Sequence, residues 1–488
     1  MSPSTDEERL LARMCSERGE SGWLEFKENN ADPQEIGEYV SALSNGAALA
    51  GRVYGYLVWG IHDRTRQIVG TSFDPSTTRK GAEELLGWLT RLLEPQVSLR
   101  FIRVPGATGV VWILEIGAAR SRPVSFAGKE YVRVGSYKKP LGKHPELERQ
   151  LWRLFEHESF ESGLAETHAT EKEVLGLLDF PAYFDVLGAA APTTQRGIFE
   201  HLTAHRLIVP DDVGWSITNL GAVSFARKLS DFDSLARKTV RVIQYAGNNR
   251  IQTIHERESE RGYASGFENL IDYITARLPQ NEVIGRALRS QTTLYPEVAI
   301  RELVANMLIH QDFSLTGTGP MVEIFADRIE FTNPGTPIVD YQRFVDLPAQ
   351  SRNERLAGMM RRAHIAEERG SGWDKVAQAV ELFQLPAPRV EVTASHTRAI
   401  MLAPQALTKM QKADRIRAVY LHACLRQVTN ETTTNASVRE RFGIPRTNTS
   451  QASRLLAEAT DAGLIAVFDS SSADRRNRQY VPFWAIEG

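Results

Sequence analysis

The chain has 488 residues, of which 42% are hydrophobic and 24% are charged, and its formal net charge is −2. This length predicts two to four domains, each of which can bury its own core. A net charge so close to zero excludes a general attraction to polyanions, so any nucleic-acid binding must come from local basic patches.

The cysteine content and the apolar runs indicate where the protein works. The two cysteines, Cys15 and Cys424, cannot form a four-thiolate zinc site or a disulfide framework, which favours a reducing, cytoplasmic compartment. The first residues contain no apolar core of signal-peptide length, and no apolar run is long enough to span a bilayer. We therefore expect a soluble protein with no membrane partner.

The first 150 residues mix short strand and helix patterns, which indicates an α+β domain. Residues 23–27 alternate like a strand. Asp32 and Pro33 supply an N-cap and a first-turn proline for a helix that we expect to end near Asn45 and Gly46. Residues 53–61 then predict a buried strand.

The rest of the chain predicts three further parts. Residues 151–285 are expected to form a helical bridging region, in which we identify no chemistry. A helix from about Pro296, followed by strands over 321–333, predicts an α/β domain over residues 286–404. Residues 411–488 have the order helix, helix, turn, helix and hairpin, which is that of a winged helix. The expected fold class is therefore multidomain α+β: an N-terminal α+β domain, a helical bridge, an α/β sandwich and a winged helix.

Acidic residues gather in the first domain. Glu25 and Lys27 share one face of the predicted strand, Glu20 lies just upstream, and Asp63 follows the buried strand. Carboxylates so placed can hold a hard divalent cation and orient a phosphate. We hypothesise a catalytic and metal-binding site made of Glu20, Glu25, Asp63 and Lys27. The alternative is that Glu25 and Lys27 form a solvated strand face and that Asp63 is a turn residue.

The segments ESGWLEFK, SALSNGA, GYLVWGIHD, QIVG and YVRVGSYKKP occur in one order over roughly residues 18–140. In this the chain resembles the Schlafen AlbA-like domain. In nuclease-active members three acids bind a divalent metal and cleave tRNA or rRNA. The resemblance places Glu20, Glu25 and Asp63 at those positions and implies Mg²⁺ or Mn²⁺. That family's zinc cysteines are missing here, and one copy of the domain is visible where vertebrate members use two, so we expect a homodimer or higher homo-oligomer.

Basic side chains follow in the same domain. They could contact phosphates, and the alternative is an ordinary solvated face. These residues are Lys129, Arg133, Lys138, Lys139 and Lys143.

A polar stripe marks the helix that begins near Pro296. Glu302, Asn306 and His310 are spaced at i, i+4 and i+8, so they lie on one face. An asparagine amide can ligate Mg²⁺ while a nearby carboxylate orients a water, which suits nucleotide chemistry. The alternative is an amphipathic helix with its polar side outward.

The segments IRELVANMLIHQDF, EFTNPGTP and ERGSGWDKV are similar to the divergent ATPase domain of the GHKL class that accompanies Schlafen-like domains in bacteria. The resemblance implies ATP, with Glu302 activating water and Asn306 binding the metal. It places Asn333 and Gly335 near adenine, and Gly370 and Gly372 near phosphate. The family's usual Asp-x-Gly-x-Gly motif is replaced here by Asn-Pro-Gly. The resemblance therefore does not decide how tightly ATP binds or whether it is slowly hydrolysed.

The C-terminal 78 residues carry eleven Lys and Arg against eight Asp and Glu. Side chains on a recognition helix and a wing can reach base edges and phosphates. The candidates are Arg446, Asn448, Gln451 and Arg454 on the helix and Arg475, Arg476 and Arg478 on the wing. Winged helices also serve as protein-docking or dimerisation modules.

Three functions fit these features. The first is a metal-dependent endoribonuclease that acts on tRNA-like RNA under the control of ATP binding, for instance in anti-phage defence. The alternative is an ATP-binding, DNA-binding transcriptional regulator without catalytic activity. The third is an assembly subunit in which neither the acidic site nor the nucleotide site is functional. RNA, DNA or both are the expected partners.

Overall fold

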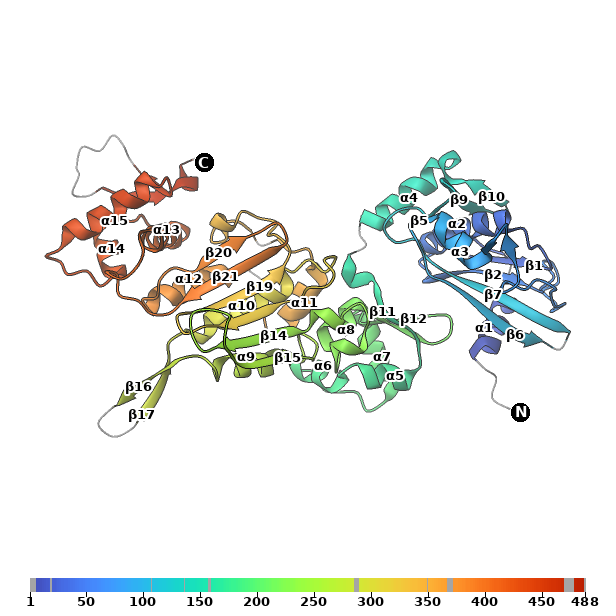
Figure 1. The fold of residues 1–488 in the computed structure, drawn as a ribbon, viewed down its shortest axis with the longest axis horizontal. Coiled ribbons are helices and arrows are strands. Elements are labelled where there is room, and N and C mark those ends of the chain that lie inside the picture. The colour runs from blue at the N-terminus through green and yellow to red at the C-terminus, as the bar shows by residue number, and fades with distance from the viewer. Residues whose placement is uncertain are drawn as a thin grey trace. The chain divides into compact units, whose positions relative to one another are not determined.

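The computed structural model describes residues 6–17, 20–106, 108–135, 137–156, 159–284, 289–348, 350–366, 372–468 and 478–486 (Figure 1). It forms two compact units. Unit 1 is Met1–Ser159 with Thr167–Glu171 and Val209–Ser216, and unit 2 is Phe160–Glu166, Lys172–Ile208 and Ile217–Gly488. Both combine helices with mixed sheets, so the expected multidomain α+β class is confirmed. Within the described ranges, no helix has the length and apolar character needed to cross a membrane.

Unit 1 contains two four-stranded sheets on either side of one long helix, α2 (Pro33–Leu49). The first sheet has the order β1-β2-β7-β6 and the second β10-β9-β8-β5. Strand β1 runs parallel to β2, and the other pairs are antiparallel. The strands are β1 (Leu24–Lys27), β2 (Tyr54–Trp59), β5 (Leu93–Glu94), β6 (Leu99–Gly106), β7 (Gly109–Gly117), β8 (Ser125–Phe126), β9 (Lys129–Val134) and β10 (Tyr137–Pro140).

The core of unit 1 lies on both faces of the first sheet. Ile36, Val40 and Leu43 of α2 pack against Leu57 and Trp59 of β2. The opposite face of the sheet is covered by α1 (Asp6–Ser16). The unit also contains a short hairpin of β3 (Arg79–Lys80) and β4 (Glu83–Glu84), with helices α3 (Leu85–Leu92) and α4 (Pro145–Glu156).

Helix α2 begins where the sequence predicts and ends later. Its N-cap Asp32 accepts a hydrogen bond of 3.2 Å from the backbone N–H of Gln34, which confirms the predicted start. The predicted end near Asn45 and Gly46 is wrong, because both residues lie inside the helix. A Cβ at Gly46 would come within 1.8 Å of the carbonyl oxygen of Gly22. Gly46 therefore permits a close approach between the helix and a loop and does not end the helix.

Residues 160–284 are not purely helical, contrary to the prediction. Strands β11 (Leu164–Ala169), β13 (Trp215–Thr218) and β12 (Ile208–Pro210) form a sheet in that order. Strands β14 (Val240–Tyr245) and β15 (Thr253–Ser259) belong to the sheet of the following domain. The sequence pattern was misread because β15 is almost wholly exposed and carries no apolar alternation. The helices here are α5 (Glu171–Leu177), α6 (Phe180–Val186), α7 (Gln195–Ala204), α8 (Asn219–Phe225) and α9 (Phe267–Thr275).

A six-stranded sheet of order β15-β14-β18-β19-β21-β20 is the centre of unit 2. Its buried face packs against α10 (Glu297–Ile309), which also contacts α12 (Gly372–Leu382). The remaining strands are β18 (Met321–Ile324), β19 (Arg328–Pro334), β20 (Arg389–Val392) and β21 (His396–Leu402), with helix α11 (Glu354–Arg362) and the hairpin of β16 (Gln280–Ile284) and β17 (Arg289–Thr293).

The C-terminal part of unit 2 follows the predicted order of helix, helix, turn, helix and hairpin. It consists of α13 (Lys412–Val428), α14 (Asn435–Arg441), α15 (Thr449–Asp461), β22 (Ile465–Val467) and β23 (Tyr480–Pro482). Helix α13 packs against α12, and Ala377 of α12 lies in the same apolar cluster as Ala418 and Leu421.

Candidate functional site

A cluster of opposite charges connects the two sheets of unit 1. Arg133 on β9 has a fully buried side chain and forms ion pairs with Glu25 on β1 and with Glu20, the latter at 3.0 Å. Its guanidinium also donates a 2.9 Å hydrogen bond to the carbonyl oxygen of Leu24. The guanidinium therefore bridges the two carboxylates.

The charges in this cluster balance. Lys27 Nζ lies 2.5 Å from Glu25 Oε1 and donates to the Tyr39 hydroxyl at 3.1 Å. Burial raises the pKa of Glu25, although Arg133 and Lys27 act in the opposite direction. Burial lowers the pKa of Lys27, but the hydrogen bond and charge of Glu25 outweigh it, so that pKa is raised. Because Glu25 is only 2% exposed, its interpretation as part of a solvated strand face is wrong.

The third predicted acid stands apart from this cluster. The side chain of Asp63 is 61% exposed and lies 3.5 Å from His62 Nδ1. Among the residues that the structure describes, no group of three or more His, Cys, Asp or Glu side chains could hold a metal ion. Glu20 and Glu25 come together as expected, but the buried guanidinium of Arg133 takes the position of the cation. The expected three-carboxylate metal site is therefore not assembled, and this arrangement does not fit a divalent ion.

The predicted basic cluster separates into two kinds of side chain. Arg133 is buried against carboxylates, so its prediction as a phosphate contact is wrong. Lys138 Nζ pairs with Glu38 at 2.5 Å and lies 4.5 Å from the centre of the Tyr39 ring. Lys129 and Lys139 are exposed. Two lysines thus converge on Tyr39, which sequence reasoning missed because nothing in the pattern of α2 distinguishes this tyrosine.

Three residues of the predicted nucleotide site lie close together where α10 meets α12. Glu302 is buried on α10, and Gly372 is the first residue of α12. A Cβ at Gly372 would lie 2.7 Å from Glu302 Oε2 and 3.7 Å from Asn306 Nδ2. Lys375 Nζ lies 3.7 Å from Glu302 Oε1. The alternative of an outward polar face is therefore wrong for Glu302.

A second part of the predicted nucleotide site lies at the end of α10. Asn333 Nδ2 donates to the backbone carbonyl of His310 at 3.4 Å. Gly335 has a φ of +99°, and a Cβ there would lie 2.7 Å from Asp312 Cβ, so this turn requires glycine. Burial and the positive charge of Arg352 lower the pKa of His310 to about 4, which keeps its imidazole neutral. Gly370 lies outside the described residues.

Helix α12 connects this site with the C-terminal helices. Near its end, Glu381 Oε2 lies 3.1 Å from His422 Nδ1 of α13, and Glu381 Oε1 lies 3.4 Å from Arg441 Nε of α14. Gly372 at the start of the same helix faces Glu302 and Asn306. One rigid element thus contacts both regions.

The predicted recognition helix, α15, carries Arg454, and Arg446 lies in the turn just before it. Arg446 and Arg454 are exposed. Asn448 donates to Gln451 Oε1 at 2.7 Å, so these two amides bind each other. Arg478 is half-buried, and Arg475 and Arg476 lie outside the described residues.

A half-buried histidine in unit 1 was missed by sequence reasoning. His168 Nε2 lies 3.1 Å from Glu115 Oε2, its Nδ1 lies 3.6 Å from Asp211 Oδ2, and its ring stacks on Tyr54. Burial opposes a charge on the imidazole, but the two carboxylates outweigh burial and raise the pKa of His168 to about 9. These residues are too far apart in sequence to form a recognisable motif.

Two segments match known protein families. Residues 20–142 match "Schlafen, AlbA_2", and residues 317–401 match "Putative ATP-dependent DNA helicase recG C-terminal". Both predicted resemblances are therefore confirmed. The second match includes Asn333, Gly335 and Gly372 and begins after Glu302 and Asn306.

No curated protein matches the chain. Among solved structures, the crystal structure of the DIP2311 protein from Corynebacterium diphtheriae is similar to it. That similarity covers 98% of this chain and 97% of the other, with 17% identity and a TM-score of 0.42.

Proposed function

We propose that this chain, with its Schlafen AlbA_2 domain and its domain of the recG C-terminal family, binds nucleic acid under the control of a bound nucleotide. The observation that carries the proposal is the position of α12. Its first residue, Gly372, faces Glu302 and Asn306, and Glu381 near its end binds Arg441 and His422.

The nucleotide would be ATP with Mg²⁺, held between α10 and α12. Because Gly372 carries no side chain, the backbone at the start of α12 can approach a phosphate closely, and the start of a helix favours an anion. The Asn306 amide oxygen can ligate the metal, and Asn333 and Gly335 would lie on the adenine side. Bound ATP would supply a phosphate chain whose charge pulls the start of α12 towards it, and Glu302 would orient water.

The nucleic acid would bind to α15. Arg446 is exposed in the turn just before this helix and Arg454 is exposed on the helix itself, while Leu455 and Leu456 face the core. A winged helix places such side chains in the major groove. Because α14 and α15 pack together, movement of α12 through Glu381 and Arg441 would reach the binding helix.

The test measures binding of fluorescent duplex DNA and of tRNA by anisotropy, with and without ATP and Mg²⁺. We expect ATP to change the affinity for one of them at least fivefold, which corresponds to about 1 kcal/mol of coupling. Glu381→Gln should reduce this coupling while both ligands still bind. Glu391→Gln, an exposed carboxylate on β20, is the matched control. If the wild type binds DNA and tRNA equally tightly with and without ATP, the proposal is wrong.

RNA cleavage by the N-terminal domain is the second candidate; the Schlafen match supports it, whereas the pairing of Glu20 and Glu25 with Arg133 does not. The test incubates the protein with tRNA and Mg²⁺ or Mn²⁺. Cleavage that is lost in both Glu25→Gln and Asp63→Asn would support a nuclease, and RNA that stays intact would contradict it. A homodimer able to clamp RNA would appear in light scattering at twice the monomer mass.

A further inference from the structure

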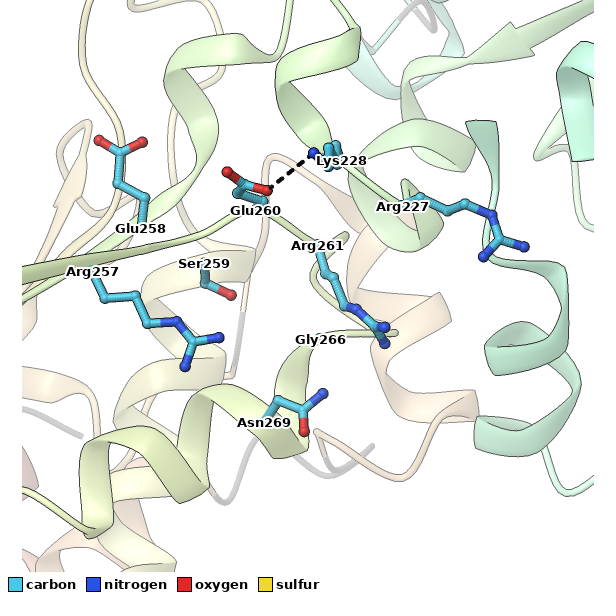
Figure 2. A pocket seen from close by; sticks show the side chains of 9 residues that line it. All are labelled: Arg227, Lys228, Arg257, Glu258, Ser259, Glu260, Arg261, Gly266 and Asn269. Atoms are coloured by element: carbon cyan, nitrogen blue, oxygen red, sulfur yellow. Dashed lines mark ion pairs between the residues drawn. The ribbon is translucent and has the colours of Figure 1, made fainter. Parts of the chain in front are cut away.

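A polar cavity of about 470 Å³ lies between β15 and the start of α9, in unit 2 (Figure 2). Its volume is within the range of ligand sites, roughly 300–1,000 Å³. Nine residues line it: Arg227, Lys228, Arg257, Glu258, Ser259, Glu260, Arg261, Gly266 and Asn269. It shares none of them with the nucleotide site around Glu302. Four of the nine are cations and none has a hydrophobic side chain, so the cavity suits an anion.

The two carboxylates in the lining interact with groups other than the arginines of the cavity. Glu258 accepts a 3.4 Å hydrogen bond from Thr239 and lies 3.8 Å from Arg241, on the opposite face of β15 from Arg257. Figure 2 shows the side chains of Glu258 and Arg257 pointing in opposite directions. Glu260 reaches Lys228 at 3.9 Å. The acidic residues therefore do not neutralise the arginines of the cavity.

The arginines of the cavity differ in whether they already form an ion pair. Arg261 lies 3.6 Å from Asp179, which caps α6. Arg257 stacks over the Tyr273 ring at 4.8 Å, which leaves its N–H groups free to bind a ligand. Arg227 is exposed. Within the described ranges, neither Arg227 nor Arg257 has an acidic partner within 4.0 Å.

The start of α9 adds a second source of positive potential. Its N-cap is Gly266, and no side chain caps the first turn. The unsatisfied N–H groups and the helix dipole at such an end favour an anion. The turn is held in place because Glu268 forms two 2.7 Å hydrogen bonds with Arg301 of α10. Asn269 and Ser259 supply further hydrogen-bond donors at the cavity.

We propose that this cavity binds a phosphate group, with Arg227, Arg257 and the first turn of α9 as its main contacts. Guanidinium groups and helix N-termini are the groups that bind phosphate in proteins. The phosphate can come from a free phosphorylated molecule or from a nucleic-acid backbone, and the chemistry of recognition is the same.

The experiment compares the full chain with Arg227→Gln/Arg257→Gln and with Arg196→Gln, an exposed arginine on α7, as the matched control. Pyrophosphate is titrated calorimetrically at low salt. Each titration is repeated in the Gly372→Ala background, in which the nucleotide site is expected to bind about tenfold more weakly, so that a loss specific to the cavity can be distinguished. We expect the double variant to weaken pyrophosphate binding about tenfold and the control to leave it unchanged.

A second arm identifies the source of the phosphate. Single-stranded and duplex oligonucleotides are titrated in the same variants. A loss of affinity for an oligonucleotide points to a nucleic-acid backbone, and a loss confined to pyrophosphate points to a free phosphorylated molecule. If neither ligand changes affinity in a double variant with a wild-type circular dichroism spectrum, the proposal is wrong. This outcome is independent of the proposed role of α15, which is tested by variants of Arg446 and Arg454.

Discussion

Arg133 and Glu25 form an ion pair inside unit 1, where their side chains are 0% and 2% exposed. Breaking a buried pair by removing one partner leaves an uncompensated charge and costs more than the pair itself contributes. The pair therefore fixes β9 to β1 and determines the charge of the whole cluster.

Arg133→Met should lower the free energy of unfolding by about 3 kcal/mol, because Glu25 keeps only Lys27 as a partner. Urea unfolding at pH 7 measures this. Arg153→Met, an exposed residue on α4, is the control. The double variant Arg133→Met/Glu25→Met should recover part of the loss, since it removes both charges. An unchanged urea midpoint in Arg133→Met would contradict the buried pair.

Gly46→Ala should destabilise unit 1 by about 1–3 kcal/mol, because the added Cβ would meet the Gly22 carbonyl and force backbone apart. Gly87→Ala in α3 is matched, since nothing lies within 4 Å of its Cβ, and it should be neutral or stabilising. Thermal unfolding distinguishes them. Equal behaviour of the two variants would show that the contact between Gly46 and Gly22 is not tight.

Gly372→Ala should weaken nucleotide binding about tenfold, or ~1.4 kcal/mol, because its Cβ would fill the space beside Glu302 and Asn306. The measurement is a titration with a fluorescent ATP analogue and Mg²⁺. Gly358→Ala in α11, whose Cβ would have only a side-chain tip at 3.7 Å nearby, should bind like the wild type. If both variants bind equally well, the nucleotide does not lie between α10 and α12.

Because of His168, the free energy of unfolding should fall as the pH rises above neutrality. Its folded pKa of about 9 lies above the unfolded value of about 6.5. The stabilisation is therefore fully present below pH 6.5 and is lost as the pH rises through 9. We expect a loss of about 2 kcal/mol between pH 6 and pH 10 that disappears in His168→Gln. Urea unfolding across this range measures it, and parallel pH profiles for the two proteins would refute the assignment.

Arg446→Gln/Arg454→Gln should reduce affinity for duplex DNA and lower the slope of log affinity against log salt by about two. Anisotropy titrations at several salt concentrations provide both values. Arg196→Gln serves as the control. A double variant with an unchanged salt slope would mean that α15 does not contact the phosphates.

The sequence determined the local features of this protein. The N-cap at Asp32, the buried strand that became β2, the stripe of Glu302, Asn306 and His310 and the order of the C-terminal elements all depend on neighbouring residues, and both family resemblances depend on short ordered motifs. Such features can be predicted from the sequence because the residues that cause each of them are close together in the chain.

Only the tertiary structure decided which charges meet. Arg133 follows Glu25 by more than a hundred residues, so its place beside Glu20 and Glu25 could not be predicted, and the expected metal site was replaced by an ion-pair cluster. The same holds for His168 with Glu115 and Asp211, and for the cavity between β15 and α9. Electrostatic sites depend on distances across the fold, whereas sequence periodicity reports only which face of an element a residue occupies.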